Sequence, residues 1–247
     1  MTQRVYVYAT DSYTETTIKD FLRKINPQIH WVIRSPYLRK MPKKDYMSNS
    51  SLPVLTGKTG KDLEDFMIAE INVHLSILSE CAAVVLEDDL DRRDSSVDQN
   101  DYLRAQQERL DAILSGLAEN RTAKMICLYA APEIETWLIE DWANSFGDAR
   151  LFDQKIATEL RKALNKIRDE CGGKFECYSH HFSEKFSDWI VDKVQQMSVG
   201  FGIADSLTAS YSKANHGAKF LRAIEPQRIE PKCRIYFSKA YHAIKAL

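Results

Sequence analysis

The chain has 247 residues, of which 44% are hydrophobic and 28% are charged, with a formal net charge of −1. A chain of this length buries enough surface to fold without disulfide staples, and its five cysteines form no C-x-x-C pair. No segment is long and apolar enough to span a membrane, and the start "MTQRVYVYAT" lacks a signal peptide's apolar stretch. These features exclude a disulfide scaffold and predict a cytoplasmic protein without membrane contact.

Segments with strand and helix patterns alternate along the first 147 residues. We expect four strands, the last two nearly all apolar, at residues 4–10, 29–35, 81–86 and 123–131. Helical spacing predicts the segments between and after them, at residues 11–25, 62–80, 101–120 and 132–146, the last opening on Pro132 as a first-turn residue. This alternation predicts an α/β sandwich with a mainly parallel sheet.

Strand patterns fade after residue 147, and the rest of the chain reads as helices and loops. We therefore predict two parts, an α/β core at residues 1–147 and a helical extension at 148–247 that packs on the core. The connection at residues 36–61 is long and holds three of the seven prolines, which favours a functional or mobile segment. Trp137, Trp142 and Trp189 fall at helical positions and are expected in the core.

Acidic residues follow two of the predicted strands. Glu87, Asp88, Asp89 and Asp91 lie within five positions, and Glu133 and Glu135 come just after the next strand. Ligands of parallel sheets bind at the carboxyl ends of the strands, and clustered carboxylates need a counter-charge such as Mg²⁺. An acid-x-acid pair in a strand points both side chains one way, and Glu87/Asp89 and Asp89/Asp91 both have this spacing.

Both groups of acids have an alternative interpretation. The acids at residues 87–91 could form a solvated loop, and Glu133 and Glu135 could simply favour the N-terminus of a helix.

Basic residues gather elsewhere: residues 211–247 hold eight Lys or Arg against two Glu. In "YSKANHGAKFLR" the candidate phosphate contacts are Lys213, His216, Lys219 and Arg222, with a solvated helix face as the alternative. The basic stretch "RSPYLRKMPKK" suits a nucleic-acid strand or is a surface loop.

These motifs together resemble a Toprim-like bacterial family of uncharacterised function. The apolar strand with its acid-x-acid pair, the later "PEIETWLIED" and the C-terminal "YSKANHGAKFLRAIEPQRIEPKC" occur in the family's order and cover most of the chain. The resemblance implies a Toprim-like, Rossmann-like fold and Mg²⁺- or Mn²⁺-dependent nuclease activity on DNA or RNA. It also implies a role in bacterial anti-phage defence beside an ATPase partner, and it leaves association between copies of the chain open.

On this hypothesis Glu87, Asp89 and Asp91 bind the metal, and Glu133 and Glu135 complete its shell or orient water. Toprim proteins usually place a glutamate at the end of the first strand as the general acid or base, whereas Tyr8 or Ala9 stands there in this chain. Asp11 or Glu15 is the expected substitute. The departure also favours a second hypothesis, a catalytically weak Toprim-like binding or regulatory subunit that docks to an ATPase.

Overall fold

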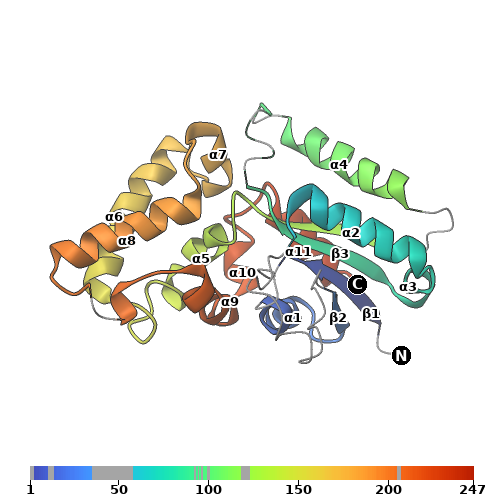
Figure 1. Ribbon diagram of the computed structural model, residues 1–247, viewed down its shortest axis with the longest axis horizontal. Coiled ribbons are helices and arrows are strands. Elements are labelled where there is room, and N and C mark those ends of the chain that lie inside the picture. The colour runs from blue at the N-terminus through green and yellow to red at the C-terminus, as the bar shows by residue number, and fades with distance from the viewer. Residues whose placement is uncertain are drawn as a thin grey trace, which may run out of the picture.

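The computed structural model describes residues 3–10, 14–34, 58–91, 93, 95, 97–98, 101–117, 123–204 and 207–247 (Figure 1). Its strands are β1 (Arg4–Ala9), β2 (His30–Arg34), β3 (Ala83–Asp89) and β4 (Lys124–Ala130). The helices up to the middle of the chain are α1 (Thr14–Ile25), α2 (Gly60–Val73), α3 (Ser76–Glu80), α4 (Tyr102–Gly116) and α5 (Glu135–Glu140). The later helices are α6 (Gln154–Glu170), α7 (Tyr178–His181), α8 (Phe186–Gly200), α9 (Ala218–Ala223), α10 (Pro226–Ile229) and α11 (Phe237–Lys245). A π-helical turn at Lys213–Gly217 precedes α9.

The four strands form one parallel sheet in the order β2-β1-β3-β4. Val85 of β3 pairs with Val7 on one side and Ile126 on the other, so β3 is a central strand. Each of these valines is completely buried, as expected for strands covered on both faces. The predicted α/β architecture with a parallel sheet is confirmed, and the arrangement is compatible with a Rossmann-like fold.

Helices cover both faces of the sheet (Figure 1). Helices α2 and α4 lie on one face and contact each other, while α1 and α11 lie on the other. An aromatic cluster holds this second face together: Trp137 stacks on Phe21 of α1 at 5.3 Å between ring centroids and meets Phe237 of α11 at 5.1 Å. The core is therefore built from both ends of the chain and from α5, which carries Trp137.

The C-terminal part contains no further strand among the residues that the structure describes. Helices α6, α7 and α8 form a lobe at the left of Figure 1, in which α6 packs against α8. Helices α9 and α10 contact α1, and α11 packs directly against β4, so the end of the chain belongs to the layer that covers the sheet. No helix in the described part of the chain is both long and apolar enough to cross a bilayer.

Three local predictions differ from the structure. The predicted helix at 62–80 is interrupted at His74, whose backbone leaves the helical region, and it forms α2 and α3. Helix α5 begins at Glu135 rather than at Pro132, which follows a cis peptide bond. Strand β3 runs three residues past the apolar segment, because β1 pairs with it as far as Glu87 and β4 as far as Asp89.

Helix α6 begins with an aspartate cap. The Asp153 carboxylate accepts hydrogen bonds from the backbone N–H groups of Lys155 and Ile156, which have no partner inside the helix. We expect Asp153→Ala to lower the free energy of unfolding by about 1 kcal/mol in urea titrations, whereas Asp153→Asn should keep most of it. An equal loss in the two variants would show that the cap is not what Asp153 contributes.

Candidate functional site

The three acids at the end of β3 point to opposite faces of the sheet. The Asp88 carboxylate lies on the side of α2, where it accepts from the backbone N–H of Gly60 at 2.8 Å and from Arg93 Nη2 at 2.6 Å. Burial raises the pKa of Asp88 to about 7 even though Arg93 lowers it. Asp88 therefore connects β3 to the start of α2, and its neighbours Glu87 and Asp89 face the other way.

Four carboxylates form an acidic cluster at the carboxyl edge of the sheet: Glu87, Asp89, Glu133 and Glu135. The backbone N–H of Thr10, just after β1, donates to Glu87, and the N–H of Ile134 donates to Asp89 at 2.9 Å. The ends of β1 and β3 and the segment after β4 therefore meet at the cluster. This edge is where ligands of parallel sheets bind.

The two glutamates after β4 are held by the C-terminal part of the chain. The Tyr211 hydroxyl donates to Glu135 Oε1 at 2.9 Å. The backbone N–H of Ser187, in the first turn of α8, donates to Glu133 Oε2 at 2.7 Å, so Glu133 stabilises the N-terminus of a helix far along the chain. Both contacts cross from the α/β part to the later helices.

Lys213 brings a positive charge to the acidic cluster. Its ammonium group makes an ion pair with Asp89 and lies 3.9 Å from Glu135 Oε2. The lysine is on the π-helical turn before α9, and its charge partly opposes the burial that raises the pKa of Glu87 and Glu133. Among the described residues, Lys213 is the basic side chain that forms ion pairs with this cluster.

The acidic cluster is buried and has one lysine beside four carboxylates, so its negative charge is only partly balanced. Glu87 is 1% exposed and Glu135 is completely buried, and no described residue donates a hydrogen bond to the Oε2 atom of either. Burial, together with Asp89 and Asp88, raises the pKa of Glu87 well above its usual range, and burial with Glu135 nearby raises that of Glu133 to about 7. Burial also raises the pKa of Glu135, although Lys213 opposes it. Such a cluster favours bound protons or a further cation.

Asp91 is separated from the acidic cluster by the turn that follows β3. Its backbone has a φ of 49°, its N–H donates to Pro132 O at 2.6 Å, and its carboxylate lies 3.9 Å from Lys185 Nζ. Of the two acid-x-acid spacings in the sequence, Glu87/Asp89 is therefore the one that faces the cluster. Asp91, which was predicted as a metal ligand, instead lies near Lys185 and outside the acidic cluster.

The predicted phosphate contacts in residues 213–222 separate in the structure. Lys213 reaches the acidic cluster, while His216 accepts from its neighbour Ser212 N at 3.2 Å through Nδ1. Lys219 is exposed, and Arg222 makes an ion pair with Asp20 of α1 at 3.4 Å. The alternative of a solvated helix face therefore describes Lys219 and Arg222 better than it describes Lys213.

Several predictions lie outside the described residues. Asp11 is among them, and so is the side chain of Glu15, whose backbone belongs to α1. Most of the basic stretch at residues 34–44 is also outside them. Tyr211 was not predicted from the sequence as a site residue. Its position two residues before Lys213, in a Tyr-x-Lys motif, was the available indication.

The donor chemistry of the acidic cluster fits a hard cation, although its arrangement is incomplete. Within the described part of the chain, no three His, Cys, Asp or Glu side chains are arranged to hold a metal ion. Mg²⁺ in proteins often takes only one or two carboxylates together with substrate phosphate oxygens. The Oε2 atoms of Glu87 and Glu135 accept no hydrogen bond within the described part of the chain, and with Asp89 beside them they match that requirement.

Fold and site define a class: an α/β protein whose parallel sheet carries a buried acidic cluster at its carboxyl edge, neutralised in part by a lysine. No protein-family model matches the sequence, and comparisons with curated proteins and with solved structures return no match either. A function is therefore proposed from the residues of this site and from the motif resemblance.

Proposed function

We propose that the acidic cluster binds a divalent cation, Mg²⁺ or Mn²⁺, and that the protein hydrolyses phosphodiester bonds in DNA or RNA. The observation that carries the proposal is the pair of buried Oε2 atoms of Glu87 and Glu135, next to Asp89, which accept no hydrogen bond from any described residue. They lie at the edge of the sheet where ligands of parallel sheets bind, and carboxylate oxygens are what hard cations prefer.

Each residue of the site has a role in this proposal. Glu87, Asp89 and Glu135 hold the cation, which when bound supplies charge stabilisation on the phosphate and acidifies a water molecule. Lys213 leaves Asp89 and contacts the phosphate, as a flexible ammonium group readily does. Glu133, with a pKa raised to about 7, exchanges a proton near neutral pH.

A second function, the binding or regulatory subunit, is favoured by two observations. Lys213 already neutralises Asp89, and β1 ends at Tyr8 and Ala9, where the Toprim resemblance calls for a glutamate. In this version the same edge binds nucleic acid or a partner without efficient cleavage. Both versions place the protein in anti-phage defence beside an ATPase, as the motif resemblance implies.

A cation titration followed by a cleavage assay tests the proposal. We expect Mn²⁺ to bind wild-type protein saturably in calorimetry, and metal-dependent cleavage of single- or double-stranded DNA or RNA to stop when EDTA removes the cation. Protein that binds Mn²⁺ but stays inert on every substrate, and that co-purifies with an ATPase, would favour the second function. Absence of Mn²⁺ binding with substrate present would contradict the cation site itself.

A further inference from the structure

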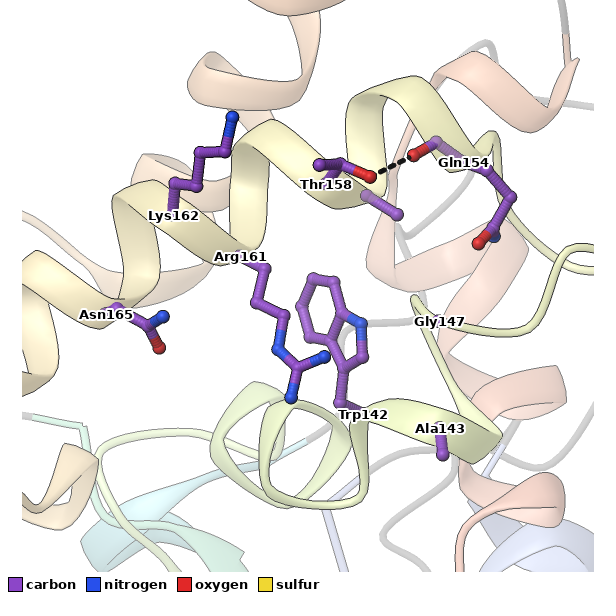
Figure 2. Close-up of a pocket in the computed structure, with 9 residues that line it drawn as sticks. Trp142, Ala143, Gly147, Gln154, Thr158, Arg161, Lys162 and Asn165 are labelled. Carbon is purple, nitrogen blue, oxygen red and sulfur yellow. Dashed lines mark hydrogen bonds between the residues drawn. The ribbon is translucent and has the colours of Figure 1, made fainter.

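A second candidate site lies in the helical lobe, beside Trp142. A cavity of about 490 Å³ separates the short 3-10 turn at Trp142–Asn144 from α6, and Figure 2 shows the residues that line it. Gln154, Thr158, Arg161 and Asn165 contribute to the lining with the spacing of one helix face. This volume lies within the range of pockets that bind small molecules.

The indole of Trp142 is a fixed wall of this cavity. One face stacks on the buried ring of Phe146, with 5.6 Å between centroids and 26° between planes. A Cβ atom at Gly147 would lie 2.6 Å from Trp142 Cδ1 and 2.7 Å from the Trp142 carbonyl oxygen, so the absence of a side chain there is what lets both the indole and the backbone of Trp142 take this position. Trp142 was expected in the core, yet it is half-buried and presents its ring to the cavity (Figure 2).

Arg161 supplies an uncompensated positive charge beside that ring. Its guanidinium carbon lies 5.8 Å from the centroid of the indole. Neighbouring cations are paired: Arg168 with Glu140 at 2.9 Å, Lys162 with Glu159 at 2.7 Å and Arg228 with Asp141 at 3.8 Å. In the described part of the chain no carboxylate lies within ion-pair distance of Arg161, so its charge is available to a ligand.

Arg161 and Trp142 also line two smaller cavities, of about 340 and 120 Å³. Both contain Lys232, and the larger also contains Arg228, Glu140 and Asp141. Lys232 pairs with Glu140 and Arg228 with Asp141, each at 3.8 Å, so the charge of Arg161 is the one that these neighbours leave unbalanced within the described part of the chain. A planar aromatic wall, an arginine and the amides of Gln154 and Asn165 are the groups that recognise a base, a phosphate and the polar edge of a base.

We propose that the cavity between Trp142 and α6 binds a nucleotide unit, with the base stacked on the Trp142 indole and the phosphate on Arg161. The guanidinium lies over the ring in the chain without ligand. Base stacking on an indole is stronger than an exposed cation–π contact, so an entering base displaces the guanidinium toward the phosphate. The site is separate from the acidic cluster and does not depend on the proposed nuclease function.

Binding in the presence of EDTA tests this site apart from any cation. The probes are adenosine 5′-monophosphate, adenosine, inorganic phosphate and a fluorescein-labelled single-stranded hexathymidylate. We expect the monophosphate, the hexamer or both to bind, at least ten-fold more tightly than adenosine or phosphate. Binding of the monophosphate identifies a free nucleotide as the ligand, and binding of the hexamer alone identifies a single strand.

Matched variants locate the binding. Trp142→Leu should weaken it at least ten-fold and Arg161→Met at least five-fold, the latter with a smaller dependence on salt. Gly147→Ala should weaken it by shifting the indole, although no group that touches the ligand is removed. Trp189→Leu, at a half-buried tryptophan of α8, and Arg104→Met, at an exposed arginine of α4, should leave it unchanged.

Four outcomes would overturn the proposal. Two concern the probes: no nucleotide probe binds at millimolar concentration, or inorganic phosphate competes for the site as well as the monophosphate does. Two concern the variants: binding is unchanged in both Trp142→Leu and Arg161→Met, or binding is lost in Asp89→Asn. If Trp142→Leu unfolds, Arg161→Met decides, because Arg161 is exposed and its removal leaves the core intact.

Discussion

Asp89→Asn should abolish Mn²⁺ binding and reduce metal-dependent cleavage by at least about 100-fold, since even the loss of groups that only orient a metal ligand costs 10–100-fold. The amide keeps an oxygen that accepts from the Ile134 N–H, so the turn after β4 stays in place. What is lost is the negative charge that holds Lys213 and, in our proposal, the cation. Calorimetry and a cleavage assay on the same preparations measure the two effects.

Asp91→Asn is the matched control for this variant. It makes the same chemical change in the same acidic run, at a residue whose carboxylate faces Lys185 instead of the acidic cluster. Asparagine also tolerates the positive φ of 49° at this position. We expect cation binding to stay within about two-fold of wild type, because a partly exposed ion pair contributes little. Equal losses in both variants, or none in Asp89→Asn, would refute the assignment.

Glu176→Gln should give the largest change in stability that depends on pH. Glu176 is buried, and its carboxylate accepts from the backbone N–H groups of Ile235 and Tyr236, each at 2.9 Å, at the start of α11. Near pH 5 this buried carboxyl is protonated in the folded state, and its hydroxyl oxygen still has lone pairs that can accept from an N–H, whereas glutamine turns a donor NH₂ group toward one of the two N–H groups. We expect the free energy of unfolding to fall by about 1–3 kcal/mol near pH 5.

The pH dependence follows from the pKa of Glu176, which burial raises from 4.5 to about 7 against the effect of the backbone hydrogen bonds. Between these values the folded state binds more protons than the unfolded state, so wild-type stability falls as the pH rises through this window. The glutamine has no such titration. The difference between the two proteins should therefore be largest near pH 5 and smaller at pH 8.

Urea denaturation at pH 5, 6.5 and 8 measures this difference. Glu170→Gln, at an exposed glutamate at the end of α6, is the control and should change stability little at any of these pH values. A penalty for Glu176→Gln that grows toward pH 8 would mean that the folded protein prefers the ionised carboxylate and that the hydrogen bonds outweigh burial.

Local patterns were enough to predict the sheet of this protein. Alternating or continuous apolar runs mark all four strands, because a strand buried on both faces must be apolar along its length. The edge that carries the acids also follows from the sequence, since parallel strands end together. The break at His74 and the start of α5 at Glu135 were not predicted, because a helical pattern does not specify where tertiary packing ends a helix.

The parallel α/β fold and the acids at its carboxyl edge could be predicted from the amino-acid sequence, because both depend on neighbouring residues. The three-dimensional structure was needed to show that Glu87 and Asp89 share a site while Asp88 and Asp91 make other contacts. It alone placed Lys213 and Tyr211 against acids more than 70 residues away in the chain. Such pairings depend on how the later helices pack on the sheet, and no local pattern of spacing or charge encodes that packing.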